Sequence, residues 1–165
     1  MPLFHRPSLR SIIARALLLG ITAGMRSQTP IAALARYQPQ APRGAEWAHW
    51  PLLRSRFGRV LLQLGWLGEL VADKLPVTPP RTNPGSLGGR ITSGAIVGLA
   101  AGSERHGAGA KLGGALAGAV GAVVGTYGGY HARKLAVETS GLPDLPIALV
   151  EDGTAATLAR AAVRG

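Results

Sequence analysis

The sequence contains no cysteine, few aromatic residues and few charges. The lack of cysteine excludes disulfide bonds, thiolate metal sites and cysteine nucleophiles. Aromatic residues make up 5% of the 165 residues and charged residues 16%, against roughly 25% charged in an ordinary soluble domain. Glycine, with 24 residues, and alanine take their place. Small side chains bury too little apolar area to stabilise a domain in water, whereas in lipid they let helices approach closely. The composition therefore favours an integral membrane protein.

Acidic residues are scarce as well. The chain has 18 Lys and Arg against 8 Asp and Glu, a formal net charge of +10. A nucleic-acid partner would require a basic stripe, but the basic residues lie mostly between apolar segments, so we expect no nucleic-acid partner. Basic loops beside apolar spans instead suit membrane lipids as partners. We therefore predict a multi-pass protein of a cell membrane, with the bacterial inner membrane as the expected site.

Five apolar segments predict an all-α bundle of about five transmembrane helices in a single membrane domain, residues 1–165. The spans are expected at about 11–35, 60–75, 90–103, 112–130 and 145–163. Residues 36–59 are rich in Pro, Trp and Arg and are expected to form a loop, with its tryptophans at the membrane interface. Basic residues divide almost equally between the two sides of such a bundle, so they do not set its orientation.

The first apolar segment is interrupted by the polar sequence Arg26-Ser27-Gln28-Thr29-Pro30. Because Pro30 removes a backbone donor, we expect a kink or two half-helices there. A secretory signal is the competing interpretation, since arginines precede the run 16–23 and Ala33-Leu34-Ala35 resembles a cleavage site. The polar break lies between that run and that site, which favours a span that is not cleaved.

Glycines recur at every fourth residue in the third and fourth segments. The series are Gly94, Gly98 and Gly102; Gly114 and Gly118; and Gly121, Gly125 and Gly129. Each series lines one face of a helix, which in lipid allows backbones to pack against each other, whereas in water each interior glycine would cost up to ~1 kcal/mol relative to alanine. We expect these faces to pack helices together, and they leave a homo-oligomer open as well. No phosphate-binding glycine motif is present.

Four acidic residues fall inside or at the edge of the apolar segments: Glu69, Asp73, Glu151 and Asp152. A charged group at bilayer depth costs at least ~2.5 kcal/mol, so such groups normally face a cavity or pair with one another. The nearest candidates for counter-charges are Arg26, Arg81 and Arg90. These residues either bind an ion or solute or form structural ion pairs that lock the bundle, and both interpretations stay open. We find no catalytic constellation, no metal site and no cofactor motif in the sequence.

Short strings in the first two spans are similar to strings in the last two. Gly20, Gly24 and Arg26 match Gly125, Gly129 and His131 in spacing, and the string 70–73 is similar to 149–152. With the third span between them, the two pairs would have opposite topology. That is the arrangement of an inverted repeat, which places a site at the interface of its halves.

Three runs resemble a known family: GITAGMRSQTPIAALA, GELVADKLP with its proline-rich sequel, and ALVEDGTA. Over residues 16–159 the chain is similar to the bacterial membrane family catalogued as domain of unknown function 4126. The resemblance implies a small multi-span protein with a polar motif in its first span. It also implies importance for Glu69, Asp73, Glu151 and Asp152. It brings no activity with it.

The function that these features favour is a transporter or channel-like module for a small ion or solute, whose identity the sequence does not give. Such a module needs its acidic residues to face a water-filled cavity. The first alternative is a non-catalytic scaffold or assembly partner, which would need exposed glycine faces. The second is a lipid-modifying membrane enzyme, which would need a nucleophile or metal cluster.

Overall fold

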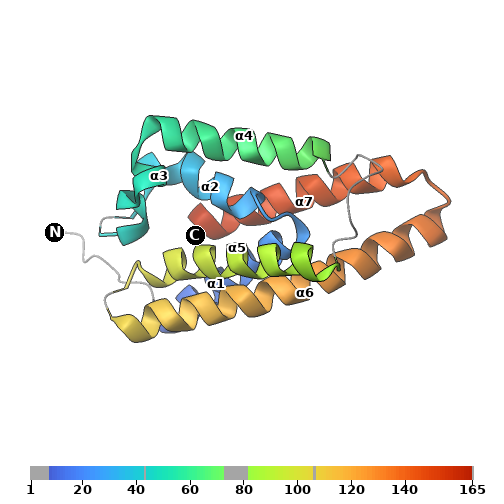
Figure 1. Cartoon of the computed structure of the whole chain (residues 1–165). Helices are drawn as coiled ribbons and strands as arrows, with labels where there is room; N and C mark the ends of the chain where they lie inside the picture. The colour runs from blue at the N-terminus through green and yellow to red at the C-terminus, as the bar shows by residue number, and fades with distance from the viewer. Residues whose placement is uncertain (1–7, 43, 73–81, 106, 165) are drawn as a thin grey trace.

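The computed structural model describes residues 8–42, 44–72, 82–105 and 107–164, and this part of the chain forms helices without any strand. The all-α class is therefore confirmed. The helices are α1 (Leu9–Met25), α2 (Thr29–Tyr37), η1 (Gln38–Gln40), η2 (Glu46–His49), α3 (Pro51–Arg54), α4 (Arg56–Ala72), α5 (Pro84–Gly102), α6 (Ala108–Ser140) and α7 (Asp144–Arg164). The long helices α4, α5, α6 and α7 lie roughly along a common direction (Figure 1).

Local capping explains where several helices begin and end. The Ser8 side chain accepts a hydrogen bond from the Ser11 amide and starts α1. Asn83 caps α5 in the same way, and Pro84 occupies its first turn, so this helix begins earlier than the predicted residue 90. Gly141 adopts the left-handed conformation, with φ 66°, and terminates α6 well beyond the predicted residue 130.

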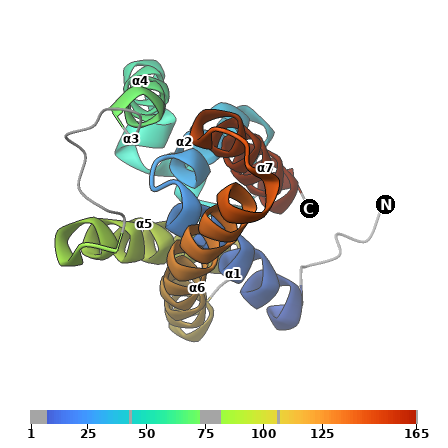
Figure 2. The same cartoon turned by 90° about the vertical axis from the view of Figure 1, so that its right-hand side faces the viewer.

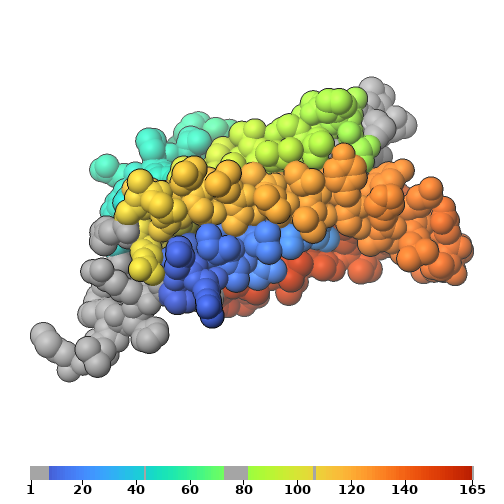
Figure 3. Space-filling model, turned by 90° about the horizontal axis from the view of Figure 1, so that it is seen from below, coloured from blue at the N-terminus to red at the C-terminus, as the bar shows by residue number. Residues whose placement is uncertain are grey.

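Helices α1, α5 and α6 form the centre of the molecule (Figure 2). Gly98 of α5 lies against Gly114 of α6. Gly94, one turn earlier in α5, lies against Gly118, one turn later in α6, so the two helices are antiparallel. Gly20 of α1 also lies against Gly118, and α1 runs parallel to α6. Helix α6 thus packs between two neighbours, and seen from below its outer face extends along the molecule (Figure 3).

The chain reverses direction between α1 and α2. Leu34 and Ala35 of α2 belong to the same buried cluster as Ala16 and Leu19 of α1, so the end of α2 returns to the level of the start of α1. The predicted span 11–35 is therefore not a single crossing but a helical hairpin. The break itself was predicted, but its angle was not, because a proline at the second position of α2 is compatible with both a kink and a reversal.

The segment expected to be a loop, residues 36–59, contains η1, η2, α3 and the start of α4. The prediction that its tryptophans lie at an interface is wrong for Trp47, which is fully buried. The indole Nε1 of Trp47 donates a hydrogen bond to Glu104 Oε1 at 3.1 Å. This segment therefore closes one end of the core.

Of the helices in the described residues, only α6 is both long and apolar enough to cross a membrane by itself. Length and composition thus support one candidate span where five were predicted. Helix α4 lies on the outside, packs on α2 and α3, and buries only Gly58. Helix α7 packs against both α1 and α2.

Candidate functional site

The turn between α1 and α2 is the most polar place inside the molecule. A helix end leaves backbone carbonyls without partners, and Arg90 of α5 satisfies two of them at the end of α1. Its Nη1 donates hydrogen bonds to the carbonyls of Gly24 and Met25, both at 2.8 Å, and the side chain is buried. A cation at a helix C-terminus is also favoured by the helix dipole.

Glu69 of α4 caps the start of α2, where backbone amides lack partners. Its carboxylate accepts hydrogen bonds from the backbone amides of Ser27 and Gln28, both at 2.8 Å. It also accepts one from the Ser27 hydroxyl at 2.6 Å. An anion at a helix N-terminus is likewise favoured by the dipole, so the two charges cap the two halves of the break.

Helix α7 and a second residue of α5 also contribute to the turn. Arg26 is 1% exposed and contacts Asp152 of α7, with Nε and Nη2 at 2.6 and 2.5 Å from the same carboxylate oxygen. The Ser93 hydroxyl of α5 donates to the Ser27 carbonyl at 2.5 Å. Residues from α4, α5 and α7 therefore converge on three consecutive residues of the hairpin.

A pocket of about 340 Å³ opens beside this turn. Its lining comes from the turn, α4 and α5, and consists of Ser27, Gln28, Glu69, Gly85, Ser86, Gly89, Arg90 and Ser93. Two glycines provide the space, and the other residues provide hydroxyl groups, an amide, a carboxylate and a guanidinium. Glu69, Arg90, Ser27 and Ser93 already form hydrogen bonds within the protein. A small polar solute or ion would bind through their remaining hydrogen-bonding capacity and through the side chains of Gln28 and Ser86.

The structure thus places four of the sequence candidates, Arg26, Glu69, Arg90 and Asp152, at one turn. Glu151 points elsewhere: its Oε2 lies 3.5 Å from Nη1 of Arg133, and Arg133 also contacts Asp144. Asp73 and Arg81 lie outside the described residues. Ser93 and Ser86 were missed by the sequence analysis, because a serine among apolar residues carries no distinctive signal.

The predicted glycine faces lie between helices of the same chain. A Cβ atom would come within 2.5 Å of a neighbouring backbone oxygen at Gly94, Gly98, Gly102, Gly114, Gly118, Gly121 and Gly125. Gly129, one turn further along α6, is half-buried. Only glycine permits such close approach of two backbones, and these positions are occupied by intramolecular contacts.

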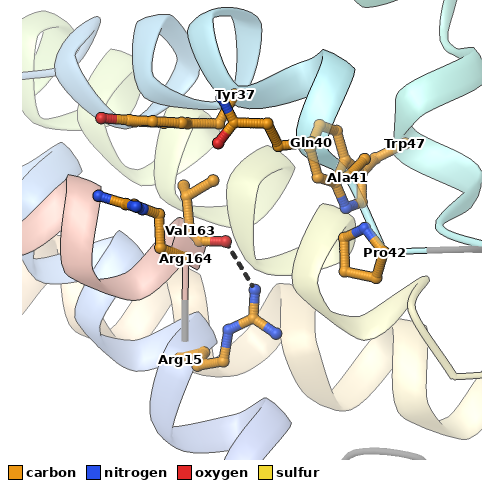
Figure 4. A pocket seen from close by; sticks show the side chains of 8 residues that line it. All are labelled: Arg15, Tyr37, Gln40, Ala41, Pro42, Trp47, Val163 and Arg164. Carbon is orange, nitrogen blue, oxygen red and sulfur yellow. Dashed lines mark hydrogen bonds between the residues drawn. The ribbon is translucent and has the colours of Figure 1, made fainter. Parts of the chain in front are cut away.

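A second charged cluster, at the other end of the hairpin, was missed. Arg15 forms two hydrogen bonds with Glu104, at 2.5 and 3.1 Å, and its Nε donates to the Ala162 carbonyl at 2.8 Å. Figure 4 shows the small adjoining pocket, with Arg15 beneath Val163 and Arg164 of α7 and Tyr37 across from them. Its volume is about 140 Å³, and the Arg15 guanidinium is already held by protein oxygens. We therefore regard this cluster as a structural tie between α1, α5 and α7.

In the described part of the chain, no three His, Cys, Asp or Glu side chains lie together as metal ligands. No family model matches the chain, and no curated protein or solved structure matches it either. The resemblance to the family of domain of unknown function 4126 therefore stays a prediction.

Proposed function

We propose that this chain is a multi-pass membrane protein and that the pocket at the hairpin turn binds a small ion or polar solute that the protein carries or conducts. The polar pocket supports the proposed binding of an ion or solute. The membrane part is supported by the extent of exposed apolar side chains and by the few charged residues that are buried.

Many large apolar side chains are exposed, and three charged residues are buried. Arg26, Arg90 and Glu151 are buried. Exposed apolar side chains form a stripe along α4 and another along α6: Phe57, Val60, Leu61, Leu64, Leu67 and Val71, then Leu112, Leu116, Val120, Val124 and Tyr127. A contiguous apolar surface of this extent would be unfavourable in water, and a bilayer would cover it.

The length of the apolar stretch on α6 matches a bilayer. Residues 112–132 contain no Lys, Arg, Asp or Glu, and at 1.5 Å per residue they extend over about 30 Å. Gly24, just before the turn, lies against Ala122 and Thr126 of this stretch. The turn and its pocket would therefore lie well inside the hydrocarbon region, where broken helices line solute and ion sites in transporters.

The hairpin also bears on the orientation, which the basic residues of a five-span bundle do not set. Because α2 returns, one end of the molecule, here called the basic end, collects most of the described arginines and lysines: Arg10, Arg15, Arg36, Arg54, Arg56, Arg59, Arg105, Lys111, Arg160 and Arg164. The acidic side chains that the structure describes there are Glu46 and Glu104. Cytoplasmic loops are enriched in Lys and Arg, so we place the basic end on the cytoplasmic side.

Single-cysteine labelling tests this placement, since the chain has no cysteine of its own. A membrane-impermeant maleimide should label Leu142→Cys, at the opposite end, in intact cells, and Arg56→Cys only after permeabilisation. Both positions are exposed. Labelling of Arg56→Cys from outside would reverse the orientation. Labelling of neither variant before lysis, with the protein recovered in the soluble fraction, would contradict the membrane assignment.

Ion flux in proteoliposomes tests the pocket, with imposed gradients of H⁺, K⁺ or Na⁺ and an entrapped indicator dye. Gly89→Leu should fill the pocket and lower the flux at least about tenfold. Gly88→Leu is the matched control, because it is the neighbouring exposed glycine, does not line the pocket and also has open space at its Cβ. Equal flux through both variants would contradict the proposal that ions pass through this pocket.

The scaffold alternative would use its glycine faces to bind other membrane helices. Seven of the predicted glycines, Gly94 to Gly125, already pack within the chain. That observation favours the pocket as the functional site over the glycine faces.

A further inference from the structure

A groove of about 370 Å³, separate from the pocket at the hairpin turn, lies between α2, α4 and α7. Ala32, Ala33, Ala156 and Trp66 give the groove an apolar wall. Thr29 and Gln63 also line the groove, but both are hydrogen-bonded within it: Trp66 Nε1 donates to Thr29 Oγ1 at 3.1 Å, and Gln63 Nε2 donates to the Ala32 carbonyl at 2.7 Å. The groove is therefore largely apolar along its length.

Arg36 and Arg160 line the end of this groove that belongs to the basic end. Both side chains are exposed, and no acidic side chain of the described residues pairs with either of them. This distinguishes them from Arg15, which is held by Glu104, and from Arg133, which is held by Asp144. Two arginines from different helices thus face one apolar groove with their charge uncompensated by neighbouring acids.

We propose that this groove binds one anionic phospholipid, with its phosphate between Arg36 and Arg160 and an acyl chain along the alanine wall and Trp66. Charge complementarity selects the occupant. A second copy of the chain would bring another basic end to the same level and repel it, and a zwitterionic lipid would add a cation beside the two arginines. The inference rests on the membrane placement proposed above, but not on the solute pocket.

The shape of the groove supports a lipid more than a free anion. Phosphate alone would fill only the end near the arginines and leave the wall formed by alanines and Trp66 uncovered. An acyl chain of the same molecule covers that wall, so one phospholipid occupies both the charged end and the apolar length of the groove. Arginine is also well suited to phosphate, since its planar guanidinium donates two parallel hydrogen bonds.

Native mass spectrometry of the detergent-purified full chain tests the proposal, with phosphatidylglycerol and phosphatidylcholine of identical acyl chains as probes. We expect one retained phosphatidylglycerol and an affinity about thirtyfold lower in the Arg36→Gln/Arg160→Gln variant. Arg54→Gln/Arg56→Gln is the matched control, because it removes the same charge from exposed positions of the basic end that do not line the groove. It should retain the lipid.

Equal loss in both double variants would overturn the groove, because attraction to the basic end as a whole would then explain the binding. Equal retention of the two lipids by the wild type would overturn it as well. Liposome flotation of the same preparation separates this result from the membrane assignment. If the protein floats with vesicles of either lipid but shows no headgroup preference, only the lipid-groove proposal is contradicted. If the protein does not float, both the groove and the membrane assignment are contradicted.

Discussion

The α1–α5–α6 interface and the α2–α4 interface are stabilised by different kinds of contact. Helices α1, α5 and α6 meet through glycines, and the atoms that touch are mostly backbone atoms, as between Gly98 and the Gly114 carbonyl. Helix α4 meets α2 through polar side chains instead. Gln63, Trp66 and Glu69 each form a hydrogen bond with the hairpin, and Gly58 is the one residue that α4 buries.

In the membrane placement proposed above, the difference follows from what drives helix association in lipid. Exposed leucines gain little by leaving lipid for another helix, so association depends on close van der Waals packing or on interhelical hydrogen bonds. The glycine interface uses the first and has few side-chain hydrogen bonds, such as that from Thr126 to the Gly24 carbonyl at 3.2 Å. The α2–α4 interface uses the second. Adding a methyl group at an interface glycine should therefore destabilise the α1–α5–α6 interface. Removing a charge or a hydrogen-bond acceptor should destabilise the hairpin, which α4 and α5 contact.

The largest effect is expected from Gly118→Ala, which places a Cβ 2.1 Å from the Gly94 carbonyl oxygen. Because backbone cannot give way as a side chain would, the free energy of unfolding should fall by about 3 kcal/mol. Thermal unfolding in detergent measures it. Gly128→Ala on the same helix meets open space and should stabilise by up to about 1 kcal/mol. Similar losses in the two variants would contradict the close packing of α5 and α6.

Next in size is Arg90→Ala, which leaves the carbonyls of Gly24 and Met25 buried without their donor. The expected loss is about 2–3 kcal/mol, measured in the same unfolding assay. Arg90→Lys can still reach one carbonyl and should recover part of the loss. An Arg90→Ala variant as stable as the wild type would mean that the end of α1 needs no cap.

A smaller effect is expected from Glu69→Gln. The amide keeps one acceptor but presents a donor to an amide hydrogen of the turn, so we expect a loss of about 1 kcal/mol. Glu138→Gln serves as the control, because Glu138 is exposed and lies 4.0 Å from Lys134. Its unfolding temperature should not change. A drop in that control as large as the drop for Glu69→Gln would point to general charge effects.

The smallest effect is expected from Lys111→Gln. Lys111 pairs with Glu46 at 2.7 Å, but both side chains are at least a third exposed. Such a pair contributes within about 0.5 kcal/mol and is screened by salt. Unfolding at low and high salt checks this, and a loss comparable to that of Arg90→Ala would show that this pair, too, is shielded from solvent.

Local pattern was enough to predict the helical class and the break before Pro30. It also pointed to Arg26, Glu69 and Asp152, because charges within apolar runs stand out, and to Arg90 as a counter-charge in the connection that follows the second run. The reversal of α2 could not be predicted, since it depends on how Leu34 and Ala35 pack on α1 and not on the residues of the turn.

Pairing partners were harder to predict than the charges themselves. Glu151 and Asp152 are adjacent, yet they contact Arg133 and Arg26 respectively, because neighbours on a helix point about 100° apart. Glu104 follows the glycine series in what looked like an ordinary loop. Its contact with Arg15 joins residues far apart in sequence, and no local pattern encodes that.

The capping of the hairpin has a consequence for the order in which the chain is made. Residues 26–28 leave the ribosome early, but the groups that satisfy them follow much later, Glu69 first, then Arg90, and Asp152 near the end of translation. In the membrane placement proposed above, the open backbone groups of the turn must until then be hydrated or held by the insertion machinery, since lipid offers them no partner. The hairpin is thus among the first parts to be synthesised and among the last to reach its final structure.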